Sequence, residues 1–354
     1  MNALLSAPPA SVCILRLSAI GDTCHVLPVL RTLQAAWPAT KFSWVIGKVE
    51  AKLLGHMPDV EFIVYDKSSG LKGVRELKHR LAGRRFDVLL HMQLALRASM
   101  LAIAIPARIK LGFDVPRARE LQWLFTTHRI ERAERQHVLD SFFGFAERLG
   151  VREKLLRWDI PIPQEDRDYA ANLIPDGRTL VISPCSSHRL RNWRAEYYAQ
   201  VADFASTAFG LRIVLCGGRT TLEKRMGEQI QAHMRQPVVN VIGKDTLRQL
   251  LATLERATVL LAPDSGPAHM ATAVGTPVIG LYATANPQRS GPYLSRQLCV
   301  DKYDAAARAL LGKPASDIPW TTKIEREGVM DLITPDDVIK KLQGFMAQRH
   351  RRKA

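Results

Sequence analysis

The sequence predicts an α/β fold with two doubly wound domains in succession. Short apolar runs with the length of buried strands alternate along the chain with longer amphipathic stretches. This alternation is typical of parallel sheets that are covered by helices on both faces. The chain has 354 residues, which suits two domains of roughly 150 residues each. In such folds ligands bind at the carboxyl ends of the strands, so candidate site residues are expected there.

The first domain is expected over residues 1–160. Its strand-like runs are residues 12–17, 42–46, 61–65, 87–92 and 108–113. The turn at 18–22 leads into a helix with an apolar face, formed by Val26, Leu27, Leu30 and Leu33. Further helical patterns lie between most of the runs, and a helix from about 132 to 149 ends this half.

The second domain is expected over residues 161–330. Prolines and a charge cluster interrupt the pattern within residues 151–178, where we place the connection between the domains. Strand-like runs begin again at Thr179, Leu211, Val238, Ala257 and Pro277. Residues 331–354 are expected to form a capped terminal helix and a basic tail, and the inward side chains of the helix are Val338, Leu342 and Phe345.

Composition places the chain among ordinary globular proteins, with 47% hydrophobic and 24% charged residues. No apolar run approaches the ~20 residues of a membrane-spanning helix, and the N-terminus lacks the charged start and cleavage site of a signal peptide. Five scattered cysteines without CxxC spacing suggest neither a disulfide framework nor a zinc site. We therefore expect a cytosolic protein.

The formal net charge of +16 indicates an acidic partner. Nucleic acid, an anionic membrane surface and a phosphorylated glycolipid all fit that charge. The sequence has no zinc finger, RRM or helix-turn-helix pattern and no interleaving of aromatic and basic residues. A nucleic-acid-binding protein is therefore the weakest of these alternatives.

The first candidate motif is SAIGDTCHVLP at residues 18–28. Gly21 allows a tight turn, and Asp22 falls at the junction between a strand and a helix, where it would face the opposite domain. Asp22 either caps the helix or acts as a general base for an attacking hydroxyl. His25, one turn later, is either its partner or an ordinary residue of the first turn.

The second candidate motif, SPCSSHRLRNW at residues 183–193, follows the first strand of the second domain. The hydroxyls of Ser186 and Ser187 and the cations Arg189 and Arg191 suit charge-assisted bonds to phosphate oxygens. The alternative is a polar loop that starts the helix near Arg194.

The third candidate is the strand, turn, helix and strand unit over residues 257–282. Asp264, Ser265 and Gly266 form the turn, and His269 projects from the first turn of the helix. A helix N-terminus presents free N–H groups and a positive dipole end, so a diphosphate is expected here. The alternative is that Asp264 and Ser265 only cap the helix.

Two glycines, Gly217 and Gly218, follow another strand of the second domain. They either let a nucleoside approach the backbone or form a plain turn. The chain has no GxGxxG dinucleotide motif here and no GxxxxGK[ST] P-loop, so hydride transfer and NTP hydrolysis lose support.

Three segments, in this order, resemble the bacterial heptosyltransferases of glycosyltransferase family 9: RLSAIGDTCHVLPVLRTL, SPCSSHRLRNW and PDSGPAHMATAVGTPVIGLYATANP. The resemblance covers most of the chain. It implies the GT-B fold, in which two Rossmann-like domains face each other across a cleft. It also implies that the donor binds the second domain, that the acceptor binds the first, and that the terminal helix returns to the first domain.

The resemblance also implies roles for single residues. Asp22 matches the catalytic base. The acceptor-side positions are Arg16, Gly21, His25 and Arg119, and the donor-side positions are Ser186, Ser187, Arg191, Gly217, Asp264, Ser265, Gly266 and His269. Arg219 stands where heptosyltransferase I has a glutamate that holds the ribose, with Glu223 as the nearest substitute.

These observations predict an inverting glycosyltransferase that moves heptose from ADP-L-glycero-D-manno-heptose to the phosphorylated Kdo–lipid A inner core of lipopolysaccharide. No cofactor and no metal are expected, because cations and a helix end stabilise the leaving ADP. The positive charge would draw the enzyme to the cytoplasmic face of the anionic inner membrane, as a peripheral protein. The alternative within the same scaffold is a transferase for another nucleotide sugar, such as N-acetylglucosamine or rhamnose.

Overall fold

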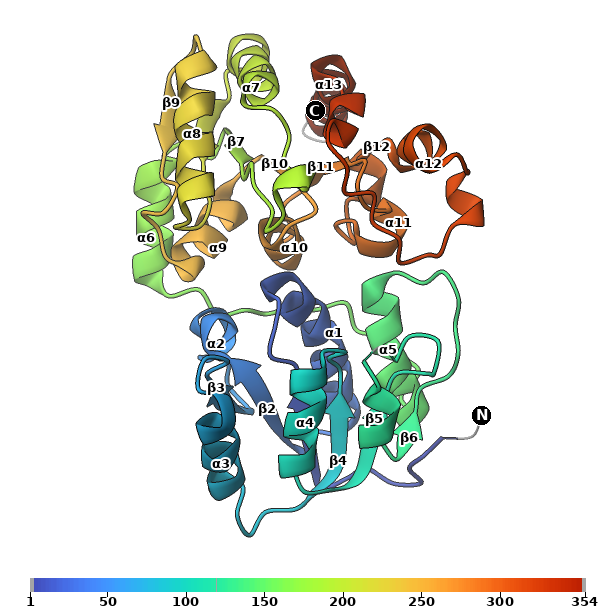
Figure 1. The fold of residues 1–354 in the computed structure, drawn as a ribbon. Helices are drawn as coiled ribbons and strands as arrows, with labels where there is room; N and C mark the ends of the chain where they lie inside the picture. The colour runs from blue at the N-terminus through green and yellow to red at the C-terminus, as the bar shows by residue number, and fades with distance from the viewer. Residues whose placement is uncertain (1–2, 119, 352–354) are drawn as a thin grey trace. The chain divides into compact units, whose positions relative to one another are not determined.

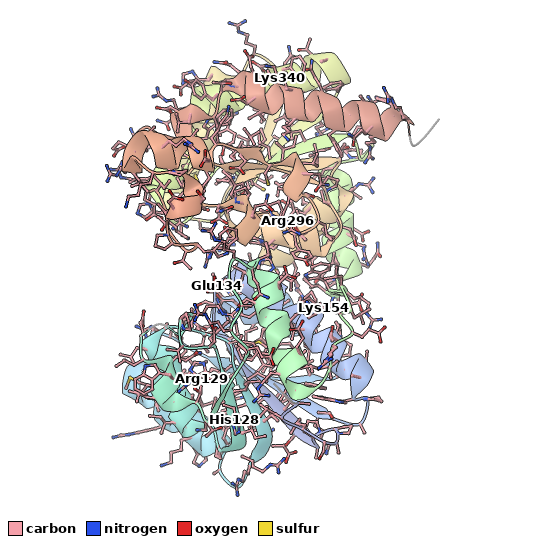
Figure 2. All side chains as sticks on the ribbon, turned by 90° about the vertical axis from the view of Figure 1, so that its right-hand side faces the viewer. His128, Arg129, Glu134, Lys154, Arg296 and Lys340 are labelled. Atoms are coloured by element: carbon pink, nitrogen blue, oxygen red, sulfur yellow. The ribbon has the colours of Figure 1, made fainter. Side chains whose placement is uncertain are left out.

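The computed structural model of the protein describes residues 3–118 and 120–351 (Figure 1). The chain divides into two compact units, Met1–Pro161 and Ile162–Ala354. In the described part of the chain, no helix combines the length and the apolar character that crossing a membrane requires. Exposed basic side chains, among them Arg129, Lys154 and Lys340, extend from the surface of both units (Figure 2).

The first unit is built on a six-stranded parallel sheet with the order β3-β2-β1-β4-β5-β6. Its strands are β1 (Ser11–Leu15), β2 (Lys41–Gly47), β3 (Val60–Tyr65), β4 (Phe86–His91), β5 (Ala107–Gly112) and β6 (His128–Arg129). The five longer strands lie where the apolar runs predict them. The two-residue β6 is too short for an apolar run to reveal it.

Helices cover both faces of this sheet. They are α1 (Ile20–Ala36), α2 (Lys48–Leu54), α3 (Gly70–Arg80), α4 (Leu96–Ala104), the 3-10 helix η1 (Gln122–Phe125) and α5 (Val138–Leu149). On one face, Leu77 of α3 and Leu101 of α4 pack into a core with Leu15 and Leu89 of the sheet. Helix α5 begins six residues later than predicted, because His137 caps it by accepting a hydrogen bond from the Leu139 N–H.

The second unit repeats this plan with the strand order β12-β11-β10-β7-β8-β9. Its strands, all parallel, are β7 (Thr179–Ile182), β8 (Arg212–Leu215), β9 (Val238–Asn240), β10 (Val259–Pro263), β11 (Val278–Tyr282) and β12 (Val300–Asp301). The short edge strand β12 is again absent from the sequence prediction.

The helices of the second unit include one that the sequence prediction misses, α6 (Gln164–Leu173), which lies inside the stretch expected to be the connection. The others are α7 (Ala195–Phe209), α8 (Thr221–His233), α9 (Leu247–Arg256), α10 (Gly266–Ala273), α11 (Pro287–Ser290), α12 (Tyr303–Leu311) and α13 (Pro335–Arg351). Short 3-10 turns accompany them: η2 (Arg189–Arg191), η3 (Arg296–Leu298), η4 (Ala315–Asp317) and η5 (Val329–Leu332).

The terminal helix α13 has its apolar face in the core of its own unit, and the expected return to the first domain stays a prediction. Val338, Leu342 and Met346 of α13 are buried in the core of the second unit, where the helix packs against α7, β11 and β12. Phe345, expected to point inward, is partly buried against the same core. An amphipathic helix needs an apolar surface to cover, and for α13 that surface is its own unit.

The strand order fixes where a ligand site can form in each unit. The order reverses at β1 and β4 in the first sheet and at β7 and β10 in the second. At such a switch point the connecting chains leave in opposite directions, so a crevice opens beyond the carboxyl ends of the strands. The motif at 18–28 follows β1, and the motifs at 183–193 and 264–269 follow β7 and β10.

Candidate functional site

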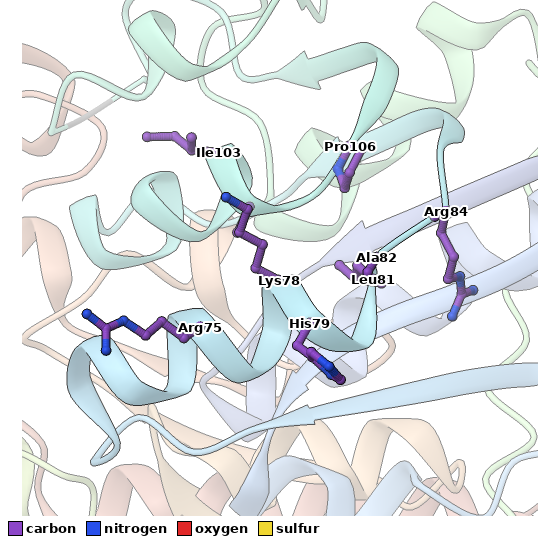
Figure 3. Close-up of a pocket in the computed structure, with 10 residues that line it drawn as sticks. Arg75, Lys78, His79, Leu81, Ala82, Arg84, Ile103 and Pro106 are labelled. Carbon is purple, nitrogen blue, oxygen red and sulfur yellow. The ribbon is translucent and has the colours of Figure 1, made fainter.

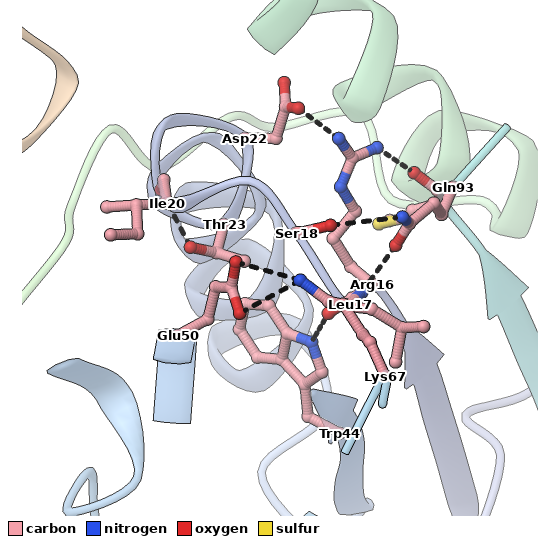
Figure 4. A network of polar contacts seen from close by, with 11 residues as sticks. Arg16, Leu17, Ser18, Ile20, Asp22, Thr23, Trp44, Glu50, Lys67 and Gln93 are labelled. Carbon is pink, nitrogen blue, oxygen red and sulfur yellow. Dashed lines mark hydrogen bonds and ion pairs between the residues drawn. The ribbon is translucent and has the colours of Figure 1, made fainter. Parts of the chain in front are cut away.

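An ion pair marks the switch point of the first sheet (Figure 4). Arg16, just after β1, is buried, and its Nη2 pairs with the Asp22 carboxylate. Its Nη1 donates a hydrogen bond to the Met92 carbonyl oxygen after β4, and its guanidinium lies 5.4 Å from the centroid of the Phe142 ring. Three contacts therefore fix the position of Arg16, and Arg16 in turn orients Asp22.

Asp22 does not cap α1. The N-cap position is Ala19, which offers no side-chain oxygen, and Asp22 lies within the first turn of the helix. Its side chain is 35% exposed, while Gly21 beside it is buried. A carboxylate that is held on one side and open to solvent on the other has the geometry that a general base needs.

A glutamine that the sequence analysis missed joins the ends of β1 and β4. The Oε1 of Gln93 accepts a hydrogen bond of 2.6 Å from the Leu17 N–H, and its Nε2 donates to Ser18 Oγ. The buried Gln122 of η1 donates to the carbonyl oxygens of Gln93 and His91. The signal in the sequence was a polar residue directly after an apolar strand.

The end of β2 completes this network. The Gly47 N–H donates to the Leu17 carbonyl, and a Cβ on Gly47 would lie only 2.3 Å from that oxygen. The buried Glu50 pairs with Lys67 at 3.3 Å. Only glycine allows this close approach of the end of β2 to Leu17.

The other acceptor-side candidates lie differently. His25 is buried and packs edge-on against His137, with ring centroids 5.4 Å apart. It therefore faces the interior between α1 and the start of α5, as an ordinary first-turn residue would. Arg119 lies outside the described residues.

In the second unit the loop after β7 orders one serine and exposes the next. The buried Ser186 donates from its N–H to Asn192 Oδ1 at 2.8 Å, and its Oγ accepts from the His188 N–H. Ser187 is exposed. The loop thus holds its backbone by its own hydrogen bonds and presents a hydroxyl to solvent.

Arg191 is held by a glutamate from a distant segment. Its Nε donates to Glu325 Oε1 at 2.7 Å, and His188 lies 3.9 Å from the other oxygen. Burial alone would raise the pKa of Glu325, but Arg191, His188 and Lys323 together lower it. Sequence reasoning missed Glu325 and Lys323, since no local pattern surrounds them.

Lys323 brings a further cation to this place. Partial desolvation lowers the pKa of Lys323, and the charges of Asp264, Arg191 and Arg289 act on the same group. The loop after β7, the turn after β10 and the 323–325 segment therefore meet at the switch point of the second sheet. A site with this many cations suits a polyanionic ligand.

The N-terminus of α10 is free of side-chain caps. Its N-cap Ser265 has extended backbone and makes no capping bond, and its Oγ is buried without a hydrogen-bond partner among the described residues. Asp264 precedes Ser265 in the chain, and its Oδ1 lies 4.0 Å from His269 Nε2. Gly266 opens the helix, and the positive dipole end of this N-terminus can bind an anion.

The glycine turn after β8 lies beside a buried carboxylate. Glu223 is engaged in a capping box with Thr220 and also accepts from the Gly218 N–H at 2.7 Å, so it has little capacity left for a ribose. Asp245 is buried, and burial raises its pKa to about 6. Gly217 forms the base of this turn, where its amide carbonyl accepts from Gly243.

Among residues 3–118 and 120–351, no three His, Cys, Asp or Glu side chains lie together as a metal site would require.

Comparisons with known proteins agree on one family. The profile of glycosyltransferase family 9 (heptosyltransferase) matches residues 74–317. The lipopolysaccharide core heptosyltransferase OpsX of Haemophilus influenzae is 42% identical over 341 residues, which cover 96% of this chain and 98% of that protein.

Two solved structures share the fold over most of the chain. A glycosyl transferase family 9 protein from Veillonella parvula has a TM-score of 0.81 at 24% identity, covering 98% of this chain and 100% of that one. The E. coli heptosyltransferase WaaC with ADP-2-deoxy-2-fluoro heptose has a TM-score of 0.64 at 22% identity, covering 81% and 97%. The expected GT-B fold is confirmed.

Proposed function

Since the chain belongs to glycosyltransferase family 9, the heptosyltransferases, we propose that it transfers heptose from ADP-L-glycero-D-manno-heptose to the Kdo region of lipid A-linked lipopolysaccharide core. Support for the core acceptor comes from OpsX, which is described as a lipopolysaccharide core enzyme. Support for the donor comes from WaaC, whose structure holds an ADP-heptose analogue.

The observation that carries the proposal is the Arg16–Asp22 pair at the switch point of the first sheet. A sugar hydroxyl is a weak nucleophile, and a carboxylate within hydrogen-bond reach can take its proton as it attacks. Arg16 holds Asp22 in one orientation, so the base needs no rearrangement before the reaction.

The reaction we propose is a single inverting displacement. The acceptor oxygen forms a bond to the anomeric carbon while its proton moves to an Oδ of Asp22. The bond between the anomeric carbon and the phosphate oxygen breaks on the opposite face, and ADP leaves with the electron pair. No covalent intermediate on the protein is required.

The second unit would stabilise the departing ADP. Charge grows on the phosphate oxygens as the bond breaks, and donors that are already positioned there lower the barrier. In this proposal Ser186, Ser187, Arg191 and Lys323 contact the diphosphate together with the N-terminus of α10. Because Arg191, Lys323 and the helix N-terminus supply positive charge, transfer is expected to proceed in the presence of EDTA.

The remaining donor and acceptor contacts follow from the same arrangement. Asp264 and His269 would reach the sugar, and Gly217 would lie against the nucleoside, whose ribose we assign to neither Arg219 nor Glu223. Since the acceptor is a phosphorylated glycolipid, we place the enzyme at the cytoplasmic face of the inner membrane as a peripheral protein.

A product assay tests the donor and the acceptor. The protein is incubated with ADP-heptose and a deacylated Kdo-containing core acceptor, and the product mass is read. The addition of one heptose supports the proposal. Transfer only from an N-acetylglucosamine or rhamnose nucleotide would replace it with the alternative.

The role of Asp22 is tested by substitution. Asp22→Ala is expected to lower kcat by at least about 100-fold, the lower end of the range of about 10²–10⁴ for a general base, and to leave the Kd for ADP nearly unchanged. Asp22→Asn keeps the shape without the basicity and should be equally inactive. If Asp22→Ala weakens ADP binding instead, Asp22 is a ligand contact and the assignment is wrong.

A further inference from the structure

We propose that the outer face formed by α3, α4 and η1 docks the first unit on an anionic lipid bilayer. This goes beyond the transfer reaction, and it rests on the proposed function only for the expectation that the acceptor is anchored in such a bilayer. The face combines an apolar stripe with a basic helix, and an anionic bilayer is a partner that fits both parts.

The apolar stripe lies on α4. Leu96, Met100 and Ile103 are 42%, 47% and 67% exposed, and their spacing of four and three residues puts them on one side of the helix. The other side, with Ala98 and Leu101, is buried against the sheet. Because a surface helix is normally polar on its outer side, this exposed apolar face needs an explanation.

The 3-10 turn η1 extends the stripe. It packs against α4, and its N-cap residue Leu121 and its own Trp123 and Leu124 are 54%, 41% and 58% exposed. With the three residues of α4, these make up six of the twelve large hydrophobic side chains that are exposed in the described residues. Such concentration in two touching elements is not the scatter of an ordinary surface, and tryptophan favours the interface between lipid and water.

The neighbouring α3 supplies the charge. Lys72, Arg75, Lys78, His79 and Arg80 are all exposed, and Arg85 follows shortly after. The acidic residue of the helix, Glu76, lies 3.9 Å from Lys72. Arg75 and Lys78 have no ion-pair partner within the described ranges, so both cations are available to an anionic surface.

Helices α3 and α4 border a hollow of about 480 Å³ (Figure 3). Lys78 extends from α3 across this hollow, and Arg75 lies at its rim. Leu81, Ala82, Ile103 and Pro106 contribute apolar walls. An apolar floor beneath cations suits a phosphate head group with the first carbons of its lipid.

The hollow is not part of the candidate transfer site. Its residues precede β4 and β5, at the amino ends of these strands, whereas Asp22 lies at the carboxyl edge of the sheet. A nucleic acid would account for the cations but not for the exposed aliphatic side chains. An anionic bilayer accounts for both, since its phosphates meet the cations and its interface takes up the apolar stripe.

Hydrogen bonds connect η1, which is part of the apolar stripe, to the candidate site. Gln122 of η1 bonds to the Gln93 carbonyl, and Gln93 bonds to Leu17 beside the Arg16–Asp22 pair. A bilayer that holds η1 would therefore lie near the carboxyl edge of the sheet. An acceptor anchored in the same bilayer would be presented at the base that activates it.

Vesicle co-sedimentation of the purified full chain tests the proposal. Vesicles of phosphatidylcholine with phosphatidylglycerol are compared with phosphatidylcholine alone. The wild type is expected to bind the anionic vesicles, and Ile103→Asp and the double variant Arg75→Glu/Lys78→Glu are each expected to bind roughly tenfold more weakly. The matched control Arg225→Glu/Lys340→Glu changes the net charge equally at exposed sites on α8 and α13 and should bind like the wild type.

Each variant is also assayed for transfer to the soluble deacylated acceptor, which needs no bilayer and should proceed at the wild-type rate. Equal loss of vesicle binding in the control and in Arg75→Glu/Lys78→Glu would overturn the proposal in favour of overall charge. A wild type that transfers heptose but binds no vesicles would also overturn it, leaving the face to a protein partner. If vesicle binding follows the expected pattern while no variant transfers heptose, the docking face stands and the proposed function fails.

Discussion

Two arginines on the same 3-10 turn allow a direct test of the donor site. Arg191 and its partner Glu325 are 16% and 28% exposed, whereas Arg189 and its partner Glu327 are 69% and 72% exposed. Two nitrogens of Arg191 donate to Glu325, which leaves its Nη1 donors for a ligand. Arg189 lies in solvent, where an ion pair contributes little.

We expect Arg191→Ala to raise the Kd for ADP by roughly tenfold to a hundredfold, the cost of losing about 1.5–3 kcal/mol from a charged hydrogen bond. Arg189→Ala, the matched control, should leave the Kd nearly unchanged. Isothermal titration of ADP into both variants measures the difference. Equal effects of the two substitutions on the Kd would show that the diphosphate does not bind at the η2 turn.

A second residue-scale prediction concerns Asp245. Burial raises its pKa to about 6, so between about pH 4 and that value the folded protein binds more protons than the unfolded chain. The free energy of unfolding therefore falls as pH rises through this window. The loss is complete above it and amounts to roughly 3 kcal/mol. A carboxylate that weakens the fold at neutral pH and lies beside the glycine turn suggests a ligand contact.

Asp245→Asn removes this charge and should raise the urea midpoint at pH 8, with the advantage shrinking towards zero near pH 4. Urea unfolding of both proteins at the two pH values provides the measurement. The exposed Asp168 supplies the control, and Asp168→Asn should show no such difference. A variant that is less stable at pH 8 would mean that the carboxylate is favourably paired there.

Candidate site residues could be located from the sequence only where they belong to a compact motif. Asp22 and Ser265 stand at strand-to-helix junctions that the apolar pattern locates. Gln93 was also predictable, because it directly follows the apolar run at residues 87–92. Lys323 and Glu325 were not, because their segment has no periodicity and is brought to the site only by the packing of the second unit.

At the scale of elements, the terminal helix α13 shows what periodicity leaves open. Its apolar face predicts burial, but the same face would suit any apolar surface. In the structure Leu342 is fully buried beside α7. Leu342→Ala should therefore destabilise the chain by about 2–5 kcal/mol, the range for a buried leucine that leaves a cavity.

The matched variant is Lys340→Ala on the exposed side of the same helix, and it should change the stability little. Urea unfolding of the full chain, followed by circular dichroism, compares the two. Equal midpoints would show that α13 contributes nothing to the core of the second unit.

Strand prediction succeeded for a physical reason that also explains its failures. A parallel strand is buried on both faces, so it appears as a continuous apolar run. The edge strands β6 and β12 have two residues each, too few for a run, and α6 follows a proline-rich stretch that indicated a linker. The strand order, which brings the motifs to two switch points, is a property of the whole sheet and cannot be read from any one segment.

At the scale of the whole molecule, the net charge of +16 sets how binding responds to salt. Exposed charges are screened over about 8 Å at physiological ionic strength and over about 3 Å at 1 M. The cations of α3 attract lipid phosphates across solvent, so salt weakens this attraction. The apolar stripe on α4 acts by removal from water, which salt does not weaken.

Binding to anionic vesicles should therefore fall steeply between about 0.1 M and 1 M sodium chloride and reach a residual level. Ile103→Asp should remove most of that residual binding, since Ile103 has the largest exposed fraction in the stripe. Co-sedimentation over a salt series, with the wild type and this variant side by side, measures both components. Binding that stays constant with salt would exclude the electrostatic component, and the excess of lysine and arginine over acidic residues would then need another partner.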